Sequence, residues 1–425
     1  MKFFWTHINH MLNSEIQLTT LSNGIRVAHK QVSSTRIVHC GFTLDIGSRD
    51  EQVQNQGIAH FWEHMAFKGT RKRKAYHILN RLDSRGGELN AFTTKEKISF
   101  YASALDTHFE KAFELLTDIT FDSIFPENQI EREKGVILEE MAMYRDSPDD
   151  ALQDEFDGLV FKDHPLGYNI LGTDQSIKSF HKNDFTDFLS GRLNTEKIVF
   201  SSVGNVSFKK VIRLAEKYLS ALPHISNSYH RDVFDNFIPD QKVITKEITQ
   251  SLCSIGRTSY PISNPARLPF VLLTNLLGGP AMNSRLNMSL RERKGFVYSI
   301  DANYSPFTDT GLFSIQFGTD QNNLNKSIDM VFRELANLKN KKLGTKQIHE
   351  AREQLKGQLA MAEENNAGFM LMMGKSLLDT QKIDPLELIF REIEGVDGSK
   401  ILELSNEMFD NSSLSILTFM PEKIP

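Results

Sequence analysis

"GIAHFWEHMAFKGT", residues 57–70, places two histidines and a glutamate within five consecutive positions of an apolar segment. Each residue of an α-helix turns by about 100°, so His60 and His64 lie one turn apart on one face, with Glu63 inside the same arc. Two imidazoles at this spacing can bind one zinc ion, and the carboxylate between them can hold a water and accept its proton. The alternative is a buried helix with hydrogen-bonded histidines, because two histidines alone do not complete a zinc site.

A second helical segment, "EREKGVILEEMAMY", offers a third ligand. On a helical wheel, Glu133 and Glu140 fall two turns apart in the middle of an apolar face, whereas Glu139 points away from it. The apolar face consists of Val136, Ile137, Met141 and Tyr144. A carboxylate facing the core needs a cation or a hydrogen-bond network to offset its desolvation. We therefore predict Glu140 as the third zinc ligand and Glu133 as a neighbouring carboxylate that tunes the site, the alternative being a solvated charged helix.

The size and composition of the chain indicate a globular protein of two domains. Its 425 residues exceed one ordinary hydrophobic core, so domains of roughly 200 residues are expected. Hydrophobic residues make up 40% and charged residues 24%, which is typical of folded chains. The formal net charge of −5 gives no reason to expect a nucleic-acid or anionic-membrane partner, and no apolar run is long enough to span a membrane.

The N-terminal segment and the cysteines predict a cytoplasmic location. In "MKFFWTHINHMLNSEIQL", polar residues interrupt the aromatic cluster before an apolar core of signal-peptide length forms. The interrupting residues are His7, Asn9, His10 and Asn13. The two cysteines, Cys40 and Cys253, fall in different halves of the chain, so no disulfide framework is implied and a reducing compartment fits. We expect the mature chain to start near residue 1 and to stay in the cytoplasm.

The order of predicted elements repeats once along the chain. Strand patterns at 24–31 and 36–47 precede the histidine helix, and a hairpin over 88–105 leads into long helices. The second half shows two strands over 242–260, then helices, a hairpin and the long helix 320–338 in the same order. Because order and lengths match although few residues do, a duplication is indicated.

We therefore predict an α+β fold of two tandem homologous domains, each a mainly antiparallel sheet packed against helices. The pattern breaks over residues 222–240, where Pro, Asn, Ser and Asp occur without a sustained period, so a linker is expected there. Residues 1–221 would form the N-terminal zinc-binding domain and residues 241–425 the C-terminal domain. The metal motif occurs only in the first copy.

These segments together resemble the pitrilysin/insulinase family of zinc peptidases, and most of all its mitochondrial-processing-peptidase-like bacterial branch. The order His60-x-x-Glu63-His64 reverses the commoner His-Glu-x-x-His and is followed further along by Glu140. The resemblance covers nearly the whole chain and includes "NAFTTKEKISFYA", "HPLGYNILGT", "SVGNV" and "LLGGPAMNSRLNMSLRERKGFVYS". Trp62 departs from the family pattern, where a smaller aliphatic residue is usual, and would narrow a pocket beside the metal.

The resemblance implies a role for each matching residue. One zinc ion per chain would be bound by His60, His64 and Glu140, with Glu63 as general base and Glu133 as an acidic helper. Tyr298 would donate a hydrogen bond to the tetrahedral oxyanion, and Arg291 would hold the substrate backbone. Asn90, Ala91 and Phe92 would be the edge strand that pairs with an extended peptide. From the residues alone, Arg291 and Tyr298 indicate only the basic end of a helix. Asn90, Ala91 and Phe92 indicate only an ordinary sheet edge.

The resemblance also implies an architecture and an activity. The chain would be half of a clamshell, and a homodimer would restore the four domains of longer single-chain relatives around a chamber. The predicted activity is that of a zinc metalloendopeptidase acting on unfolded peptides. One alternative is a catalytically silent structural or assembly subunit of the same fold, and another is a module that captures peptides without cutting them. The enzyme is favoured because one chain contains all of His60, Glu63, His64, Glu140, Arg291 and Tyr298.

Overall fold

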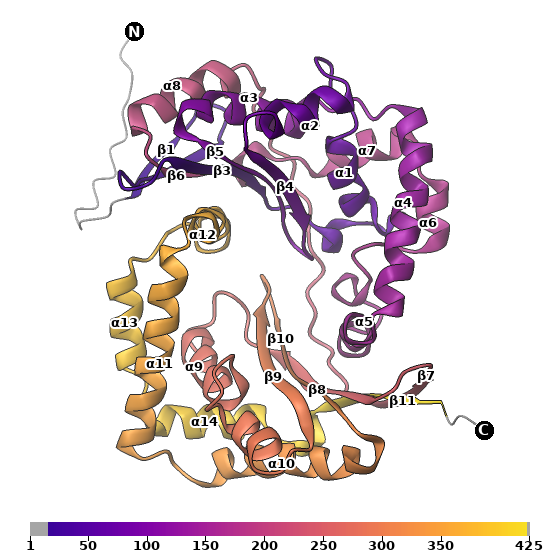
Figure 1. Ribbon diagram of the computed structural model, residues 1–425, viewed down its shortest axis with the longest axis vertical. Coiled ribbons are helices and arrows are strands. Elements are labelled where there is room, and N and C mark those ends of the chain that lie inside the picture. Colours follow the sequence, from indigo (N-terminus) through magenta and orange to yellow (C-terminus); the bar gives the residue numbers. More distant parts are fainter. Residues whose placement is uncertain (1–15, 423–425) are drawn as a thin grey trace.

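The structure is a computed structural model and describes residues 16–422 (Figure 1). The residues on which the predicted absence of a targeting segment rests, His7, Asn9, His10 and Asn13, lie outside this range. Within residues 16–422, no helix combines the length and the apolar character needed to cross a bilayer. Cys40 and Cys253 are both buried free thiols, one in each half of the chain.

Two β-sheets organise the described residues, one in each half (Figure 1). The first has the strand order β1-β2-β6-β3-β5-β4 and is antiparallel except for the β2–β6 pair. Its strands are β1 (Ile16–Thr20), β2 (Arg26–Gln31), β3 (Ile37–Leu44), β4 (Glu88–Thr93), β5 (Ile98–Leu105) and β6 (Ile198–Gly204). β4 therefore lies at one edge of this sheet, with β5 as its only strand partner among the described residues.

The second sheet repeats the order of β2, β6, β3, β5 and β4, and β1 has no counterpart in it among the described residues. Its order is β7-β11-β8-β10-β9, and β7–β11 is its only parallel pair among the described strands. The strands are β7 (Gln241–Lys246), β8 (Ser251–Ser259), β9 (Val297–Pro306), β10 (Gly311–Thr319) and β11 (Ser415–Pro421). β9 occupies the edge position that β4 has in the first sheet. The predicted duplication and the α+β fold are thereby confirmed.

In both halves, helices follow the strands in a similar order along the chain. Those of the first half are α1 (Ile58–Ala66), α2 (Ala75–Asp83), α3 (Phe109–Phe121), α4 (Glu127–Asp146), α5 (Pro148–Val160), α6 (Asp174–Ser179), α7 (Lys182–Arg192) and α8 (Phe208–Leu219). Those of the second half are α9 (Arg267–Gly278), the π-helical turn Asn287–Glu292, α10 (Leu324–Asn340), α11 (Thr345–Glu364), α12 (Asn366–Thr380), α13 (Leu386–Glu394) and α14 (Gly398–Met408).

The core of the first half is built from aromatic side chains between its sheet and α3. Phe113 of α3 packs against Phe200 of β6, with ring centroids 4.3 Å apart, and Phe42 of β3 lies 5.1 Å from the same ring. All three side chains are fully buried. Because successive strand residues point to opposite faces, Thr43 and Ser201 face the other side of the sheet.

That other face is covered by a helix from the second half. α12 lies against β6 and β3, and Figure 1 shows it on the side of the first sheet that faces the second half. A Cβ on Gly374 of α12 would lie 2.6 Å from Thr43 Oγ1, so only glycine allows this close approach. Met370 and Leu377 of the same helix bury Val203 and Val199.

The exchange of helices between halves is reciprocal. α5, which has the same place in the first half as α12 in the second, packs on β8 and β11 of the second sheet. Its Leu152 and Phe156 join Leu417 and Phe419 in one buried cluster. Sequence analysis did not predict this exchange.

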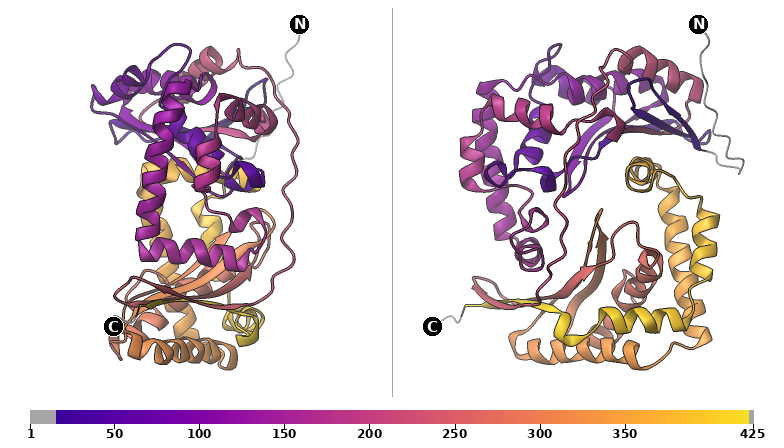
Figure 2. Two further views of the ribbon diagram at one scale, coloured as in Figure 1. Left: turned by 90° about the vertical axis from the view of Figure 1, so that its right-hand side faces the viewer. Right: turned by 180° about the vertical axis from the view of Figure 1, so that it is seen from behind.

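Residues 222–240 connect the halves without a regular helix or strand and run along one side of the molecule in Figure 2. The domain boundaries given above remain predictions.

Candidate metal centre

The three predicted zinc ligands lie together, although they come from helices that are far apart in sequence. His60 and His64 project from α1 and Glu140 from α4, and one ligand atom of each lies within 4.8 Å of the others. His64 Nε2 is 3.4 Å from Glu140 Oε2, and His60 Nε2 is 3.8 Å from Glu140 Oε1. The two imidazole rings have centroids 4.6 Å apart. The spacing of four residues on one helix face thus brings both rings to one point.

This donor set fits a zinc ion. Zinc prefers nitrogen and carboxylate oxygen ligands at about 2.0–2.2 Å, and tetrahedral geometry then separates neighbouring ligand atoms by about 3.3–3.6 Å. The two measured separations, 3.4 and 3.8 Å, lie at or near this range. His60 is 7% exposed, and Glu140 is partly exposed, so the cluster is open to solvent on one side. Three protein ligands with an open side are typical of catalytic rather than structural zinc sites.

Glu133 lies behind His64 and not among the ligands. Its Oε1 is 2.9 Å from His64 Nδ1, and its Oε2 is 2.7 Å from Lys68 Nζ. Glu133 is 5% exposed, and these two contacts account for the burial of its charge. A carboxylate in this position fixes the ring orientation and leaves Nε2 directed at Glu140, free to serve as a ligand. The predicted neighbouring carboxylate is therefore in place.

The two histidines have opposite electrostatic environments. Burial, and then the nearby His64, lower the pKa of His60 to about 4. Burial also disfavours protonation of His64, but hydrogen bonds to Glu133 and Glu140 outweigh it and raise the pKa of His64 to about 9. The cluster therefore stabilises one positive charge, which is what a cation held by neutral imidazoles would supply.

Glu63 lies beside the cluster and is held by the end of the edge strand. Thr93, the last residue of β4, donates from Oγ1 to Glu63 Oε2 over 2.5 Å. Burial raises the pKa of Glu63, and the Thr93 hydrogen bond opposes this rise. The carboxylate is thus partly desolvated and oriented, as a general base requires.

A buried carboxylate that the sequence analysis missed holds the start of α1. Glu51 accepts hydrogen bonds from Gly57 N at 2.8 Å and from Ala59 N at 2.9 Å. These amides are unpaired donors of the first helical turn, and Gly57 has a φ of 91°. The usual capping signal is a polar residue at the N-cap itself. Glu51 lies six residues before the N-cap Gly57, so no local sequence pattern indicates its role.

Two sequence-based expectations about neighbouring side chains were wrong. Val136 and Tyr144, assigned to an apolar core face of α4, are 47% and 36% exposed, whereas Ile137 and Met141 are buried as predicted. α4 presents one side to α1 and another to solvent, so only part of the expected face is covered. Trp62 does not line a pocket, because it is fully buried with its ring 5.5 Å from Phe100.

Arg291 and Tyr298 lie together in the second half of the chain. Arg291 lies in the π-helical turn Asn287–Glu292 and Tyr298 near the start of β9, with the guanidinium 5.9 Å from the ring centroid. Tyr298 is 83% exposed. Among the described residues, neither forms a hydrogen bond or an ion pair with the three ligands.

The predicted peptide-binding segment lies beside the histidine helix. Asn90, Ala91 and Phe92 are in the edge strand β4, which packs next to α1. Each of the three is partly or fully exposed, and Phe92 packs against Tyr101 of β5.

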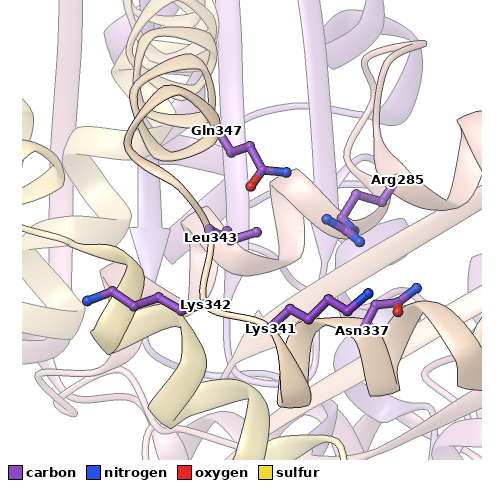
Figure 3. Close-up of a pocket in the computed structure, with 6 residues that line it drawn as sticks. All are labelled: Arg285, Asn337, Lys341, Lys342, Leu343 and Gln347. Atoms are coloured by element: carbon purple, nitrogen blue, oxygen red, sulfur yellow. The ribbon is translucent and has the colours of Figure 1, made fainter.

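A surface pocket in the second half is not part of this centre. It has a volume of about 290 Å³ at the junction of α10 and α11 and is lined by Arg285, Asn337, Lys341, Lys342, Leu343 and Gln347 (Figure 3). Arg285 is paired with Glu334 and Lys342 donates to Ser399 Oγ, and none of the predicted site residues contributes to the lining.

Comparison with known proteins agrees with this architecture. Residues 26–174 match the family model described as insulinase (peptidase family M16), and residues 179–355 match the one described as peptidase M16 inactive domain. An uncharacterized zinc protease of Bacillus subtilis, YmxG, is 32% identical over 93% of this chain and 96% of its own length. The mitochondrial-processing peptidase subunit beta of Saccharomyces cerevisiae is 27% identical over 93% of this chain and 89% of its own.

Solved structures share the fold at lower identity. The crystal structure of a protease from Helicobacter pylori superposes with a TM-score of 0.88 at 19% identity and covers 96% of this chain and 99% of that one. A peptidase M16 inactive domain from Pseudomonas fluorescens gives the same TM-score at 18% identity, over 97% of this chain and 99% of that one. With a relative 32% identical over almost its full length and family models matching both halves, this chain belongs to the insulinase family of peptidases, M16.

Proposed function

We propose that this chain is a zinc-dependent metalloendopeptidase that hydrolyses peptide bonds in unfolded peptides enclosed in a chamber. The observation that carries the proposal is the convergence of His60, His64 and Glu140, with the carboxylate of Glu63 held beside them by Thr93. The names of relatives as zinc proteases and as a processing peptidase subunit support it at the level of the family.

The residues of the chain divide the chemistry between them. A zinc ion held by the three ligands would act as a Lewis acid that polarises the scissile carbonyl and makes water easier to deprotonate. Glu63 takes the proton of the attacking water and passes it to the leaving amine. Glu133 keeps the His64 ring oriented, and the Tyr298 hydroxyl donates a hydrogen bond to the oxyanion while Arg291 holds substrate carbonyl groups.

Substrate binding is assigned to the edge of the first sheet. Among the described strands, β4 has a partner on one side only, so the backbone groups of Asn90, Ala91 and Phe92 can pair with an extended peptide. Binding through backbone hydrogen bonds tolerates many sequences, but it requires that the substrate strand is not already paired. A folded protein is therefore a poor substrate.

The lack of a hydrogen bond between Tyr298 and the three ligands, among the described residues, supports an active site shared between two chains. Within one chain the two groups have no contact among the described residues, whereas a symmetric pair of chains can place Arg291 and Tyr298 of each opposite the cluster of the other. One relative is named as a subunit, which is consistent with assembly into a larger particle. We assign a homodimer, and a cytoplasmic location remains a prediction from the sequence.

The test combines mass and selectivity. Light scattering gives the mass in solution, and a quenched peptide is compared with the same segment placed inside a stable domain, each with and without chelator. The proposal requires a dimer that cuts the free peptide, leaves the domain intact and stops on zinc removal. A fully active monomer, or equal cleavage of both substrates, contradicts the chamber. Absence of cleavage in a zinc-loaded dimer would favour the silent subunit.

A further inference from the structure

The turn between β4 and β5 carries three consecutive charged residues, and all three are buried. Lys95, Glu96 and Lys97 are 7%, 4% and 6% exposed. Three adjacent charges in a hairpin turn would ordinarily be solvated, because burying a charge is costly unless it is paired and hydrogen-bonded. Each of these three side chains therefore needs partners, and segments of both halves provide them.

The two lysines are tied to separate helices. Lys95 donates from Nζ to the carbonyl of Tyr168 over 2.7 Å and lies 3.4 Å from Asp157 of α5. Lys97 pairs with Asp379 of α12, the helix that the second half contributes to the first sheet. The turn is thus fixed at both of its sides.

Glu96 connects the same turn to the hairpin between β9 and β10. Its carboxylate accepts from Thr308 N at 3.2 and 3.1 Å, from Thr308 Oγ1 at 3.0 Å, and from Arg49 Nη1 at 2.7 Å. Arg49 in turn donates to Asp309 of that hairpin over 2.5 and 2.8 Å. Each of these partners of the Glu96 carboxylate is a donor, and the three contacts made by Thr308 cross from the first half to the second.

The turn leads directly to the proposed general base. The residue before it, Thr94, is bound within the turn through Thr94 N to Lys97 O at 2.8 Å, and Ser48 N donates to Thr94 O over 3.1 Å. The next residue back is Thr93, whose hydroxyl donates to Glu63 Oε2. Thr308 is therefore connected to Glu63 by a path that consists of its hydrogen bonds to Glu96, the backbone of residues 93–96 and the hydrogen bond from Thr93.

We propose that Glu96 is a positioning residue, through which the β9–β10 hairpin of the C-terminal half holds the β4–β5 turn and so keeps Thr93 and Glu63 in their working geometry. The proposal rests on the proposed function, because it assumes that Glu63 acts as the base. It gives the C-terminal half a second task, separate from any substrate contact by Arg291 and Tyr298. It also explains why charged residues are buried at a turn that touches no ligand.

The expected consequence is a defect in turnover and not in zinc binding. Glu96 touches none of the three ligands, so metal content is unaffected when its contacts are broken. A displacement of about 1 Å at a catalytic group can cost on the order of a hundredfold in rate. We expect kcat to fall by roughly tenfold to a hundredfold in Glu96→Gln, with KM within about twofold. The amide must turn its NH₂ group toward a donor, so at least one contact is lost.

The experiment compares variants along the path with a matched contact off it. Glu96→Gln alters every contact of the carboxylate, and Thr308→Val removes the hydroxyl contact while keeping the backbone one. Thr308→Val keeps the test possible if Glu96→Gln does not fold. At the far end, Thr93→Val should lower kcat similarly while Thr93→Ser restores it. Glu363→Gln is the control, because Glu363 pairs with Lys30 over 3.1 Å, also between the halves, without touching the turn. For each protein, kcat, KM, zinc content and hydrogen exchange over residues 88–97 are measured.

The outcomes separate this inference from the proposed function. Support requires lower kcat and faster exchange over 88–97 in the path variants, full zinc in all, and a wild-type result for Glu363→Gln. Unchanged kcat and exchange in Glu96→Gln overturn the inference, as does a parallel loss of zinc, which would indicate a general structural role. If the wild-type protein cuts no peptide, the proposed function fails, and unchanged exchange in Thr308→Val and Glu96→Gln then overturns the anchoring independently.

Discussion

His64 Nδ1 lies 2.9 Å from Glu133 Oε1, so the ring of a predicted zinc ligand is held by a carboxylate that is itself paired with Lys68. The contact determines which ring nitrogen is available, because Nδ1 is occupied and Nε2 faces Glu140 at 3.4 Å. The orientation of the His64 ring is thus set by Glu133 and Glu140, which lie seven positions apart on α4.

Glu133→Gln should weaken zinc binding without abolishing it. The loss of an outer carboxylate partner typically costs tenfold to a hundredfold in metal affinity, and we expect about that range here. Competition with a chromophoric chelator measures the change. Glu139→Gln is the matched control, since Glu139 is exposed on the same helix. Equal zinc affinities for the two variants would contradict the role of Glu133.

His64→Ala and Glu140→Gln should each lose bound zinc, because two of three protein ligands do not hold a catalytic zinc ion firmly. The wild-type protein should contain about one zinc per chain. Metal analysis after dialysis against a weak chelator is the measurement, with His77→Ala, an exposed histidine of α2, as the control. Wild-type zinc content in both ligand variants would refute this ligand set.

Glu63→Gln should keep zinc and lose most hydrolysis. The amide has nearly the same shape and can still contact Thr93, but it cannot accept a proton from water. Loss of a general base typically lowers the rate about a hundredfold or more. A quenched-peptide assay at matched zinc content tests this, and near-normal turnover by a folded variant would end the assignment of Glu63 as base.

Tyr298→Phe should lower kcat far more than it raises KM. One oxyanion donor is worth on the order of 3 kcal/mol, and the interaction is made mainly in the transition state. In the proposed dimer, Tyr298 of one chain serves the cluster of the other. Mixing Tyr298→Phe chains with Glu63→Gln chains should therefore restore activity, because each mixed dimer has one site with both groups intact. No recovery after subunit exchange would place Tyr298 and Glu63 in sites formed by one chain.

The ion pair of Asp309 with Arg49 joins the two halves, and its contribution to stability should be lost at acidic pH. Burial alone would raise the pKa of Asp309, but hydrogen bonds and charge from Arg49 keep it below the ordinary value of 3.8. A depressed folded-state pKa means that this stabilisation is fully present above about pH 4 and is lost as the pH falls through the folded-state pKa.

Asp309→Asn should therefore lower stability at pH 7 by about 1–3 kcal/mol, the usual range for hydrogen bonds to a charged group. The gap in melting temperature from the wild-type protein should stay constant from pH 7 to about pH 5 and close only below about pH 4. A gap that is already closed at pH 5 would show that the ion pair does not contribute as described.

The sequence predicted the parts of the site that depend on local periodicity. The positions of His60, Glu63 and His64 on one helix face follow from 3.6 residues per turn, and Glu140 stood out as a carboxylate on a partly apolar helix face. The parallel between the two halves was also visible, because strands and helices keep their order after duplication. These features require no knowledge of which helix packs on which sheet.

Features made by distant segments could not be predicted in this way. The residues "TKEK" at 94–97 form a solvated turn by any local criterion, and their burial follows only from partners such as Thr308 and Asp379. Val136 was placed in the core because a helical wheel gives the direction of a side chain but not what lies opposite to it. Glu51 showed no signal for the same reason, since its amide partners lie beyond an irregular segment.

The exchange of α5 and α12 between the halves sets the order in which a new chain can mature. When β6 has left the ribosome, the face of the first sheet that carries Val199 and Val203 is still uncovered, because α12 has not been made. At 5–20 residues per second, the segment from β6 to α12 takes roughly ten to thirty seconds to synthesise. During that interval the first domain presents an apolar sheet face to the cell, and a chaperone that recognises such a surface has its longest opportunity there. Truncation before α12 would leave this face exposed, because Met370 and Leu377 of α12 are the residues that pack on Val203 and Val199.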